Sequence, residues 1–277
     1  MKKTAIILGS KPASVAALLI LKKRGWEIKE VVASRSQADW IPEPSLYKLA
    51  ENLNIPVVEK QTELKKKSVN LVISYMYRSL VKEPTLLRGE YAINFHAGPL
   101  PEFGGWAFYN AAILENSREY GCTCHIMDNG FDTGPLVKVR RFHINPNTET
   151  AYSLERKAQL EMLFLFEEVL SIYESSGKLP MEAQPLERMR YMKANEFSVL
   201  KEVPITATQE EIDRTARAFW YPPYEMAYMT TPLGVKVELV PEIVKQDIAH
   251  RYHASDLDTY LKVFNLKHKV ITGEING

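Results

Sequence analysis

Apolar residues gather in short runs in the first part of the chain, and stretches with helical spacing separate these runs. The runs predict buried strands, because a strand covered on both faces is apolar along most of its length. The intervening stretches predict helices, the first of which is closed by Gly25. The predicted strands are Thr4–Ser10, Glu27–Ser34, Pro56–Val58, Val69–Ser74 and Tyr91–His96, and the predicted helices are Ala13–Arg24 and Pro44–Asn54. Strands that alternate with helices indicate βαβ units and a mostly parallel sheet covered by helices.

The pattern changes beyond the strand at Tyr91–His96. Two further predicted strands, Gly121–Met127 and Leu136–Ile144, follow each other without a helix between them, which favours antiparallel pairing at the end of the sheet. A helix is expected at Phe108–Asn116, and one long helix with a wide apolar stripe at Glu149–Gly177. The sequence therefore predicts an α/β domain that ends near residue 180.

Prolines become frequent after the long helix and predict a linker near residues 178–190. A helix is then expected at Thr206–Phe219, where Thr208 is the N-cap and a glutamate three residues later completes a capping box. Met226–Val240 is expected to hold two strands around a Pro-Leu-Gly turn. Residues 191–277 are therefore predicted to form a small C-terminal α+β appendage.

The composition narrows the class of protein. The chain has 277 residues, of which 45% are hydrophobic and 25% charged, as in ordinary globular domains. Its formal net charge of +1 argues against a protein held on nucleic acid by bulk charge. The two cysteines exclude a disulfide scaffold, and the apolar stretch Ala13–Leu21 is shorter than the roughly 20 residues of a membrane span. We expect a cytoplasmic enzyme that binds neither nucleic acid nor membrane.

Asn94 and His96 are the first candidates for chemistry. They lie two residues apart on a predicted strand, so their side chains share one face, and Gly98-Pro99 ends the strand directly after them. Open α/β sheets bind their ligands at this end of the strands. Each residue alone also suits a polar strand end that caps a nearby backbone group.

The stretch Met127-Asp-Asn-Gly-Phe-Asp-Thr-Gly134 is the second candidate. It has the composition of an ordinary turn, but it could also bring a carboxylate beside His96. A histidine can then accept a proton from an attacking amine, the carboxylate can orient the imidazole, and an asparagine amide can stabilise the developing oxyanion. The pattern therefore suits acyl transfer.

A metal site is a weaker interpretation of Cys122-Thr-Cys124 and His125. Strand alternation places the two thiols on one face and the imidazole on the other, so a shared ion is awkward. His250 and His253 could share a helix face, but no acidic partner accompanies them. We expect small buried side chains at the two cysteines and no metal.

Two blocks of sequence carry a resemblance to a known family. Asn94-Phe-His-Ala-Gly-Pro-Leu-Pro-Glu-Phe-Gly-Gly105 resembles the Asn-x-His-x-x-x-Leu-Pro-x-(Phe/Tyr)-x-Gly signature of formyltransferases that use 10-formyltetrahydrofolate. Gly121-Cys-Thr-Cys-His-Ile-Met-Asp-Asn-Gly-Phe-Asp-Thr-Gly134 resembles their second signature, at the spacing of that family. The resemblance covers about residues 4–175. It implies a Rossmann-like catalytic domain over residues 1–180 and N10-formyltetrahydrofolate as the formyl donor, with no metal.

The resemblance also implies site residues. Asn94, His96 and Asp132 match the catalytic trio, and Asp132 rather than Asp128 matches the aspartate before Thr/Ala-Gly. The loop after the fourth strand and the second signature resemble the family's folate-binding segments, although their apolar side chains also suit core packing. The folate contacts implied in this way are Met76, Leu80, Ile126, Asp128, Asn129, Gly130 and Phe131.

The acceptor is expected to be a nucleotide-linked amino sugar, such as a dTDP- or UDP-amino-dideoxysugar used for surface glycans such as lipopolysaccharide. Residues Ala216–Tyr224 look like a segment of the nucleotide-sugar N-formyltransferases, whose small C-terminal appendage implies a homodimer.

The residues that could contact the acceptor are Tyr77, Arg78, Trp106 and Tyr109, which equally suit a lid over the core or surface salt bridges. Ala97-Gly98-Pro99 departs from the usual Pro-Ser-Leu after the histidine. An aminoacyl-tRNA or peptide amine as acceptor, a 10-formyltetrahydrofolate hydrolase and a catalytically silent binding protein remain as alternatives.

Overall fold

The computed structural model describes residues 2–36, 43–65, 68–192 and 194–245, and its largest feature is one sheet in the strand order β3-β2-β1-β4-β5-β7-β8. The pairs among β3, β2, β1, β4 and β5 are parallel, whereas β7 is antiparallel to both β5 and β8. The strands are β1 (Thr4–Gly9), β2 (Glu27–Val32), β3 (Val57–Val58), β4 (Val69–Tyr75), β5 (Gly89–His96), β7 (Glu119–Ile126) and β8 (Leu136–His143). The predicted α/β class, with a mostly parallel sheet that ends in antiparallel strands, is confirmed.

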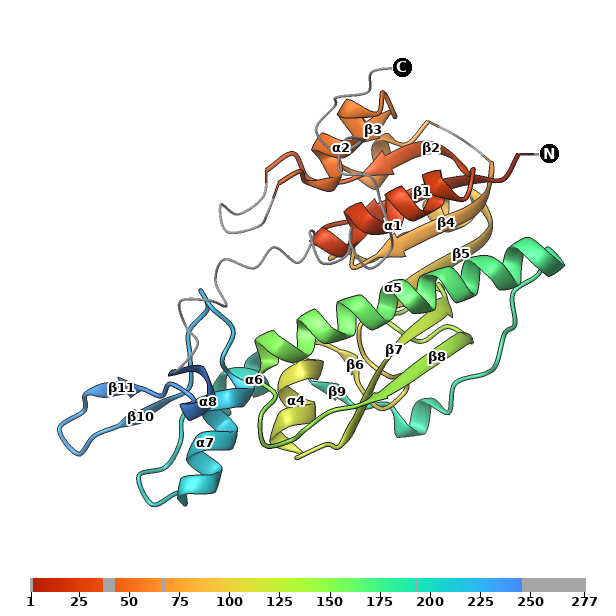
Figure 1. The fold of residues 1–277 in the computed structure, drawn as a ribbon. Coiled ribbons are helices and arrows are strands. Elements are labelled where there is room, and N and C mark those ends of the chain that lie inside the picture. The colour runs from red at the N-terminus through yellow and green to blue at the C-terminus, as the bar shows by residue number, and fades with distance from the viewer. Residues whose placement is uncertain (1, 37–42, 66–67, 193, 246–277) are drawn as a thin grey trace.

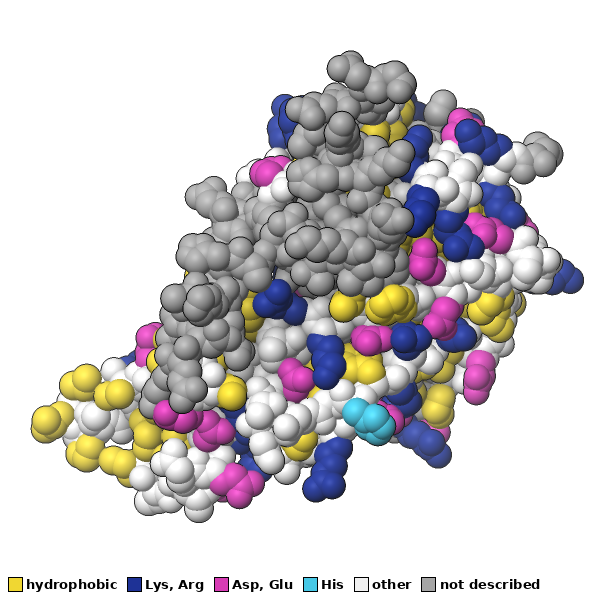
Figure 2. All heavy atoms as spheres, in the orientation of Figure 1, with side chains coloured by type: hydrophobic (Ala, Val, Ile, Leu, Met, Phe, Trp, Pro, Cys, Tyr) yellow, Lys and Arg dark blue, Asp and Glu magenta, His cyan; other side chains and the backbone are white. Residues whose placement is uncertain are grey.

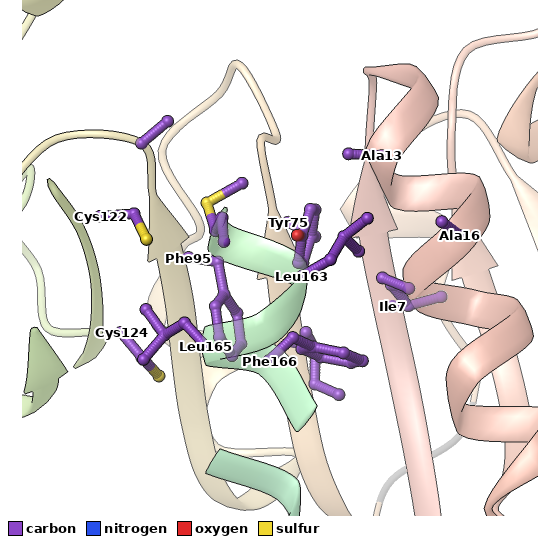
Figure 3. Packing of buried hydrophobic residues seen from close by; sticks show 14 of the residues in the cluster. Ile7, Ala13, Ala16, Tyr75, Phe95, Cys122, Cys124, Leu163, Leu165 and Phe166 are labelled. Carbon is purple, nitrogen blue, oxygen red and sulfur yellow. The ribbon is translucent and has the colours of Figure 1, made fainter. Parts of the chain in front are cut away.

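Helices α1 (Pro12–Lys23) and α5 (Ala151–Ser176) run along one face of this sheet (Figure 1). The larger core cluster lies between them and the strands. Phe95 of β5 stacks on Tyr75 of β4 with ring centroids 5.3 Å apart, and Phe166 of α5 meets Phe95 edge-on at 5.0 Å (Figure 3). Because side chains alternate along a strand, this packing fixes which residues of β5 face away from α5.

The ends of the predicted helices follow from their caps. In α5 the Thr150 hydroxyl accepts from the backbone N–H of Ser153, and Gly177 closes the helix at φ +69°, a conformation that favours glycine. Gly25 has φ +82° just after α1. Helix α2 (Leu46–Asn52) begins later than predicted, because Ser45 is its N-cap.

The opposite face of the sheet carries a smaller core cluster. Ile6 and Leu8 of β1, Val72 of β4 and Ala92 of β5 belong to it, and Tyr77 packs against it. Asn94 and His96 follow Ala92 at steps of two residues, so they lie on this second face, beyond the apolar cluster.

Short elements complete the described chain. Among them, β6 pairs in parallel with β9, and β10 and β11 form an antiparallel hairpin that projects from the rest of the molecule (Figure 1). These elements are η1 (Gln61–Glu63), α3 (Glu83–Leu86), β6 (Gly104–Gly105), α4 (Phe108–Leu114), η2 (Leu186–Arg188), β9 (Tyr191–Met192), α6 (Ala194–Val199), α7 (Gln209–Ala218), β10 (Tyr228–Thr230), β11 (Lys236–Glu238) and α8 (Glu242–Lys245). The predicted capping box at Thr208 is present, and α7 starts directly after it. His250 and His253 lie outside the described residues.

A buried arginine of α7 forms hydrogen bonds with the loop before α5. Arg217 is only 4% exposed, and its Nη1 donates to the carbonyl oxygens of Pro146 at 2.6 Å and Glu149 at 3.1 Å. Asn110 of α4 donates to the carbonyl of Ala218 at 2.6 Å. The region around α7 therefore packs against α4 and the start of α5.

None of the helices in the described part of the chain is long and apolar enough to cross a membrane.

Candidate active site

The pairing of β5 with β7 assembles the polar end of the second face. Asn94 lies opposite His125 in the antiparallel ladder, and His96 lies opposite Thr123. The Thr123 hydroxyl donates to the carbonyl of Gly98 at 2.8 Å and accepts from the N–H of Leu100 at 2.9 Å. The chain just after His96 is therefore fixed to β7, next to the polar side chains.

A tight loop after β7 returns Asp132 to this group. Asp128 shapes the loop, since its Oδ1 accepts from the N–H of Gly130 at 2.9 Å and the Thr133 hydroxyl at 2.7 Å. Asp132 itself has φ +58°, a conformation that costs free energy for a residue with a side chain. A Cβ at Gly134 would lie 1.8 Å from the carbonyl oxygen of Ile126, so only glycine permits this close return.

The structure brings the three predicted catalytic side chains together. Asp132 Oδ2 lies 3.6 Å from His96 Nδ1, and Asp132 Oδ1 lies 3.5 Å from Asn94 Nδ2. The backbone N–H of Gly105 donates to Asp132 Oδ2 at 3.0 Å. An amide and an imidazole that both contact one carboxylate form the acid–base set expected for acyl transfer.

The second nitrogen of His96 is held by the backbone. His96 Nε2 lies 2.7 Å from the carbonyl oxygen of Phe103, which can only accept, so Nε2 carries the proton. A Cβ at Gly98 would lie 2.7 Å from that same oxygen and 2.8 Å from Nε2. In the neutral ring, the lone pair therefore sits on Nδ1, facing Asp132.

His125 is a fourth polar side chain that the sequence interpretation did not assign to the site. Its Nδ1 donates to the carbonyl of Ile126 at 2.9 Å, and its Nε2 lies 3.0 Å from Asn94 Nδ2 and 3.5 Å from Asp132 Oδ1. Strand alternation had already separated His125 from the two cysteines. The missing information was the register that places it opposite Asn94.

Gln184 is a second contact that the sequence did not reveal. Its Nε2 donates to the carbonyl of Asp132 at 3.0 Å and to that of Gly134. It lies in the predicted linker, and no sequence pattern marks it.

The charge on Asp132 is set by its neighbours. Burial by itself would raise the pKa of this carboxyl, but the neighbouring rings of His96 and His125 and the N–H of Gly105 together hold the pKa well below its ordinary value. Asp132 is therefore a carboxylate at neutral pH.

The proposed folate contacts fall in two different environments. The half-buried side chains of Met76 and Ile126 pack against the larger core cluster, the one that faces α5. Phe131 is 52% exposed at the tip of the loop before Asp132. Leu80 is half-buried, and its carbonyl accepts from Gln61 Nε2 at 2.8 Å. The remaining three, Asp128, Asn129 and Gly130, are exposed in the loop.

The residues proposed to contact the acceptor also differ in exposure. Trp106 is 57% exposed and meets Phe197 edge-on at 5.5 Å, whereas Tyr109 is buried and packs against Phe108. Arg78 is exposed, and Tyr77 is half-buried, which raises the pKa of its phenol. Trp106 and Arg78 are thus the two with side chains open to solvent.

The two cysteines lie on the α5 side of β7 (Figure 3). His125 alternates with them along the strand and therefore faces the other side of the sheet. Both cysteines are buried, and burial raises the pKa of each thiol above its ordinary value. They behave as small apolar side chains of the core. No group of three His, Cys, Asp or Glu side chains that could hold a metal is found in the described ranges.

Comparison with known proteins identifies the family. The family model described as formyl transferase matches residues 6–169, and the chain belongs to this family. The predicted family is thereby confirmed.

Two curated relatives show that members of the family are named for different formyl acceptors. GDP-perosamine N-formyltransferase of Brucella melitensis is 31% identical over 176 residues, which cover 63% of this chain and 65% of the relative. Methionyl-tRNA formyltransferase of Bartonella henselae is 31% identical over 199 residues, which cover 66% of this chain and 63% of the relative. The matched region thus spans less than two thirds of either relative.

A solved structure shares the fold. The N-formyltransferase of Helicobacter canadensis, determined in complex with folinic acid and dTDP-3-aminofucose, matches with a TM-score of 0.70 at 22% identity. The match covers 84% of this chain and 85% of that chain. The sheet, the covering helices and part of the C-terminal region therefore have a counterpart in a protein of known structure.

Proposed function

We propose that this protein transfers a formyl group from N10-formyltetrahydrofolate to the primary amine of a nucleotide-linked amino sugar. The observation that carries the proposal is the contact between His96 Nδ1 and the Asp132 carboxylate, with the amide of Asn94 beside them. Membership of the formyl transferase family and the relative that acts on GDP-perosamine support it.

His96 is the base in this proposal. The hydrogen bond from Nε2 to Phe103 leaves the Nδ1 lone pair to accept a proton from the attacking amine. Asp132, 3.6 Å away, stabilises the imidazolium that results. The donor supplies a formyl carbon already activated by its bond to N10. A new bond joins that carbon to the amine nitrogen, the bond to N10 breaks, and the proton held at His96 passes to N10.

Asn94 stabilises the oxyanion. One N–H of its amide is directed at His125 Nε2, 3.0 Å away. The Asn94 amide nitrogen lies farther from Asp132, at 3.5 Å, so its second N–H is available to an oxygen that gains negative charge.

The binding sites for donor and acceptor are proposed around this trio. The donor would be held by the loop after β4, through Met76 and Leu80, and by the segment from Ile126 to Phe131. The acceptor would meet Trp106 and Arg78, because the indole can stack on a base and the guanidinium pairs with phosphate. Tyr77 and Tyr109 would shape the site from more buried positions.

Donor turnover is the experiment that tests the function. Release of tetrahydrofolate from N10-formyltetrahydrofolate is followed with and without a panel of dTDP-, UDP- and GDP-linked amino sugars. His96→Asn is expected to abolish release, whereas His143→Asn, the same change at an exposed histidine of β8, is expected to leave it intact. Release that requires one sugar and vanishes in His96→Asn establishes the reaction. Wild-type release in His96→Asn would remove His96 from the mechanism.

A second acceptor is favoured by one finding, the similarity to methionyl-tRNA formyltransferase. The same assay with methionyl-tRNA in place of the sugars distinguishes the two. Release with methionyl-tRNA alone would replace the sugar proposal, and release without any acceptor would indicate a hydrolase.

The location, oligomeric state and domain organisation of the enzyme are also proposed. We infer a cytoplasmic homodimer that serves the synthesis of surface glycans such as lipopolysaccharide, with residues 1–180 as the catalytic domain and residues 191–277 as the appendage that dimerises. Apolar side chains gather on the β10–β11 hairpin (Figure 2), where Leu233 is 90% and Val235 57% exposed. An exposed apolar patch of this kind suits a second copy of the chain.

A further inference from the structure

The segment that follows α5 contacts the loop that carries Asp132 and also β6, the strand whose N–H binds the Asp132 carboxylate. We name residues 182–192 the strap. Its first residue forms a two-bonded bridge with the start of β8: Leu136 N–H donates to the Glu182 carbonyl at 2.7 Å, and Glu182 N–H donates to the Leu136 carbonyl at 2.8 Å. This bridge fixes the backbone two residues before Gln184.

Gln184 holds the backbone on both sides of Thr133. Its Nε2 has two N–H groups and two partners, the carbonyl oxygens of Asp132 and Gly134. The reverse orientation of the amide would turn its oxygen toward two acceptors, so the partners themselves assign the nitrogen. A single side chain thus restrains a stretch that contains a positive φ at Asp132.

The far end of the strap supports the carboxylate of Asp132. The Arg190 carbonyl accepts from the N–H of Gly104 at 3.2 Å, and β9 runs parallel to β6. The next residue, Gly105, donates its N–H to Asp132 Oδ2 at 3.0 Å. The strap therefore contacts the backbone of Asp132 at one end and the strand that binds its side chain at the other.

We propose that Gln184 is a positioning residue for Asp132, and that the strap belongs to the catalytic machinery rather than being a linker. The family model ends at residue 169, so Gln184 itself lies outside the region that identifies the family. The proposal rests on the proposed function, in which Asp132 stabilises the His96 imidazolium. Misplacement of a catalytic group by about 1 Å can lower a rate by about a hundredfold, and only a fixed loop keeps the 3.6 Å contact.

Two substitutions test the proposal. Gln184→Met keeps the length of the side chain and removes both donors, and Gln184→Glu places acceptors against two carbonyl oxygens. Both are expected to lower kcat roughly 10- to 100-fold, with the KM of the donor within about twofold of wild type. Gln209→Met, the same change at an exposed position of α7 outside the strap, is the control and is expected to leave both constants unchanged.

Hydrogen exchange measured by mass spectrometry provides a readout that does not depend on activity. Backbone amides of residues 126–136 are expected to exchange faster in both Gln184 variants, while those of β1 do not change. The proposal would be overturned if the Gln184 variants kept the wild-type exchange rate in this segment or the wild-type kcat. It would also be overturned if kcat and KM changed by the same factor while Tm fell, because general destabilisation would then explain the effect. If the wild-type protein released no tetrahydrofolate, the proposed function would fail, and exchange alone would decide the role of Gln184.

Discussion

Single residues decide what the site can do chemically, and His96 is the clearest case. Ala97-Gly98-Pro99 departs from the family's usual residues after the histidine, but the structure gives Gly98 a role. A side chain at Gly98 would collide with the Phe103 carbonyl that binds His96. The glycine therefore permits the hydrogen bond that directs the His96 lone pair toward Asp132.

Asn94→Ala is expected to lower turnover by about 10²–10³, because the oxyanion would lose a donor that is already in place. Steady-state release of tetrahydrofolate measures the change, and circular dichroism shows whether the fold is kept. Asn147→Ala, at an exposed position, is the matched control. A near-normal rate in Asn94→Ala would exclude Asn94 from the mechanism.

Asp132→Asn is expected to destabilise the protein in a pH-dependent manner. The folded pKa of Asp132 is lowered, so its contribution to stability is complete above the ordinary aspartate pKa of about 3.9 and is lost as the pH falls toward the folded pKa. The Tm difference between wild type and variant should be constant from about pH 7 to 5 and should shrink below about pH 4. Thermal melts across this range test it, and a difference independent of pH would contradict the assignment.

At the scale of elements, two features position the parts of the molecule described above. The register between β5 and β7 brings the polar side chains of the site together, and the docking of α7 fixes that helix against the loop before α5. The register places Asn94 opposite His125. The docking of α7 depends on Arg217, whose guanidinium lies buried against two carbonyl groups of the loop before α5.

Arg217→Ala is expected to lower the free energy of unfolding by about 2–4 kcal/mol, since it leaves buried carbonyls without their charged donor. Thr208→Ala, at the N-cap of the same helix, should cost only about 1 kcal/mol. Urea denaturation of both variants measures the two values. Equal losses would mean that Arg217 contributes no more than the cap does.

The elements also show how far sequence patterns reach. Strand and helix positions followed from apolar periodicity and from caps such as Gly25 and Thr208, because these signals are local. The short pair β6 and β9 was not predicted, since each strand has two residues and their pairing joins distant parts of the chain. The trio was predictable because its residues lie in two compact motifs, whereas Gln184 lies in neither.

At the scale of the whole molecule, the β10–β11 hairpin is the most exposed apolar feature of the described residues. Val237, Val235 and Leu233 are between 47% and 90% exposed. These side chains support the proposal that two copies of the chain associate through the appendage.

Val237→Glu is expected to convert a dimer into a monomer, because a buried, unpaired carboxylate at an interface is unfavourable. Light scattering after size exclusion measures the mass. Leu87→Glu, the same kind of change at a site 75% exposed next to α3, should leave the dimer intact. A wild-type protein with the mass of one chain would refute the dimer.

The sequence by itself determined the class of fold and the order of its elements, and it singled out Asn94, His96 and Asp132 as candidates, because periodicity, caps and compact motifs depend only on residues close together in the chain. Tertiary structure decided the rest. Only the folded chain places His125 against Asn94, the Phe103 carbonyl against His96 and Gln184 against the loop of Asp132. The physical reason is that a hydrogen bond depends on distance and direction in space, and residues far apart in the sequence acquire both only when strands pair in one register.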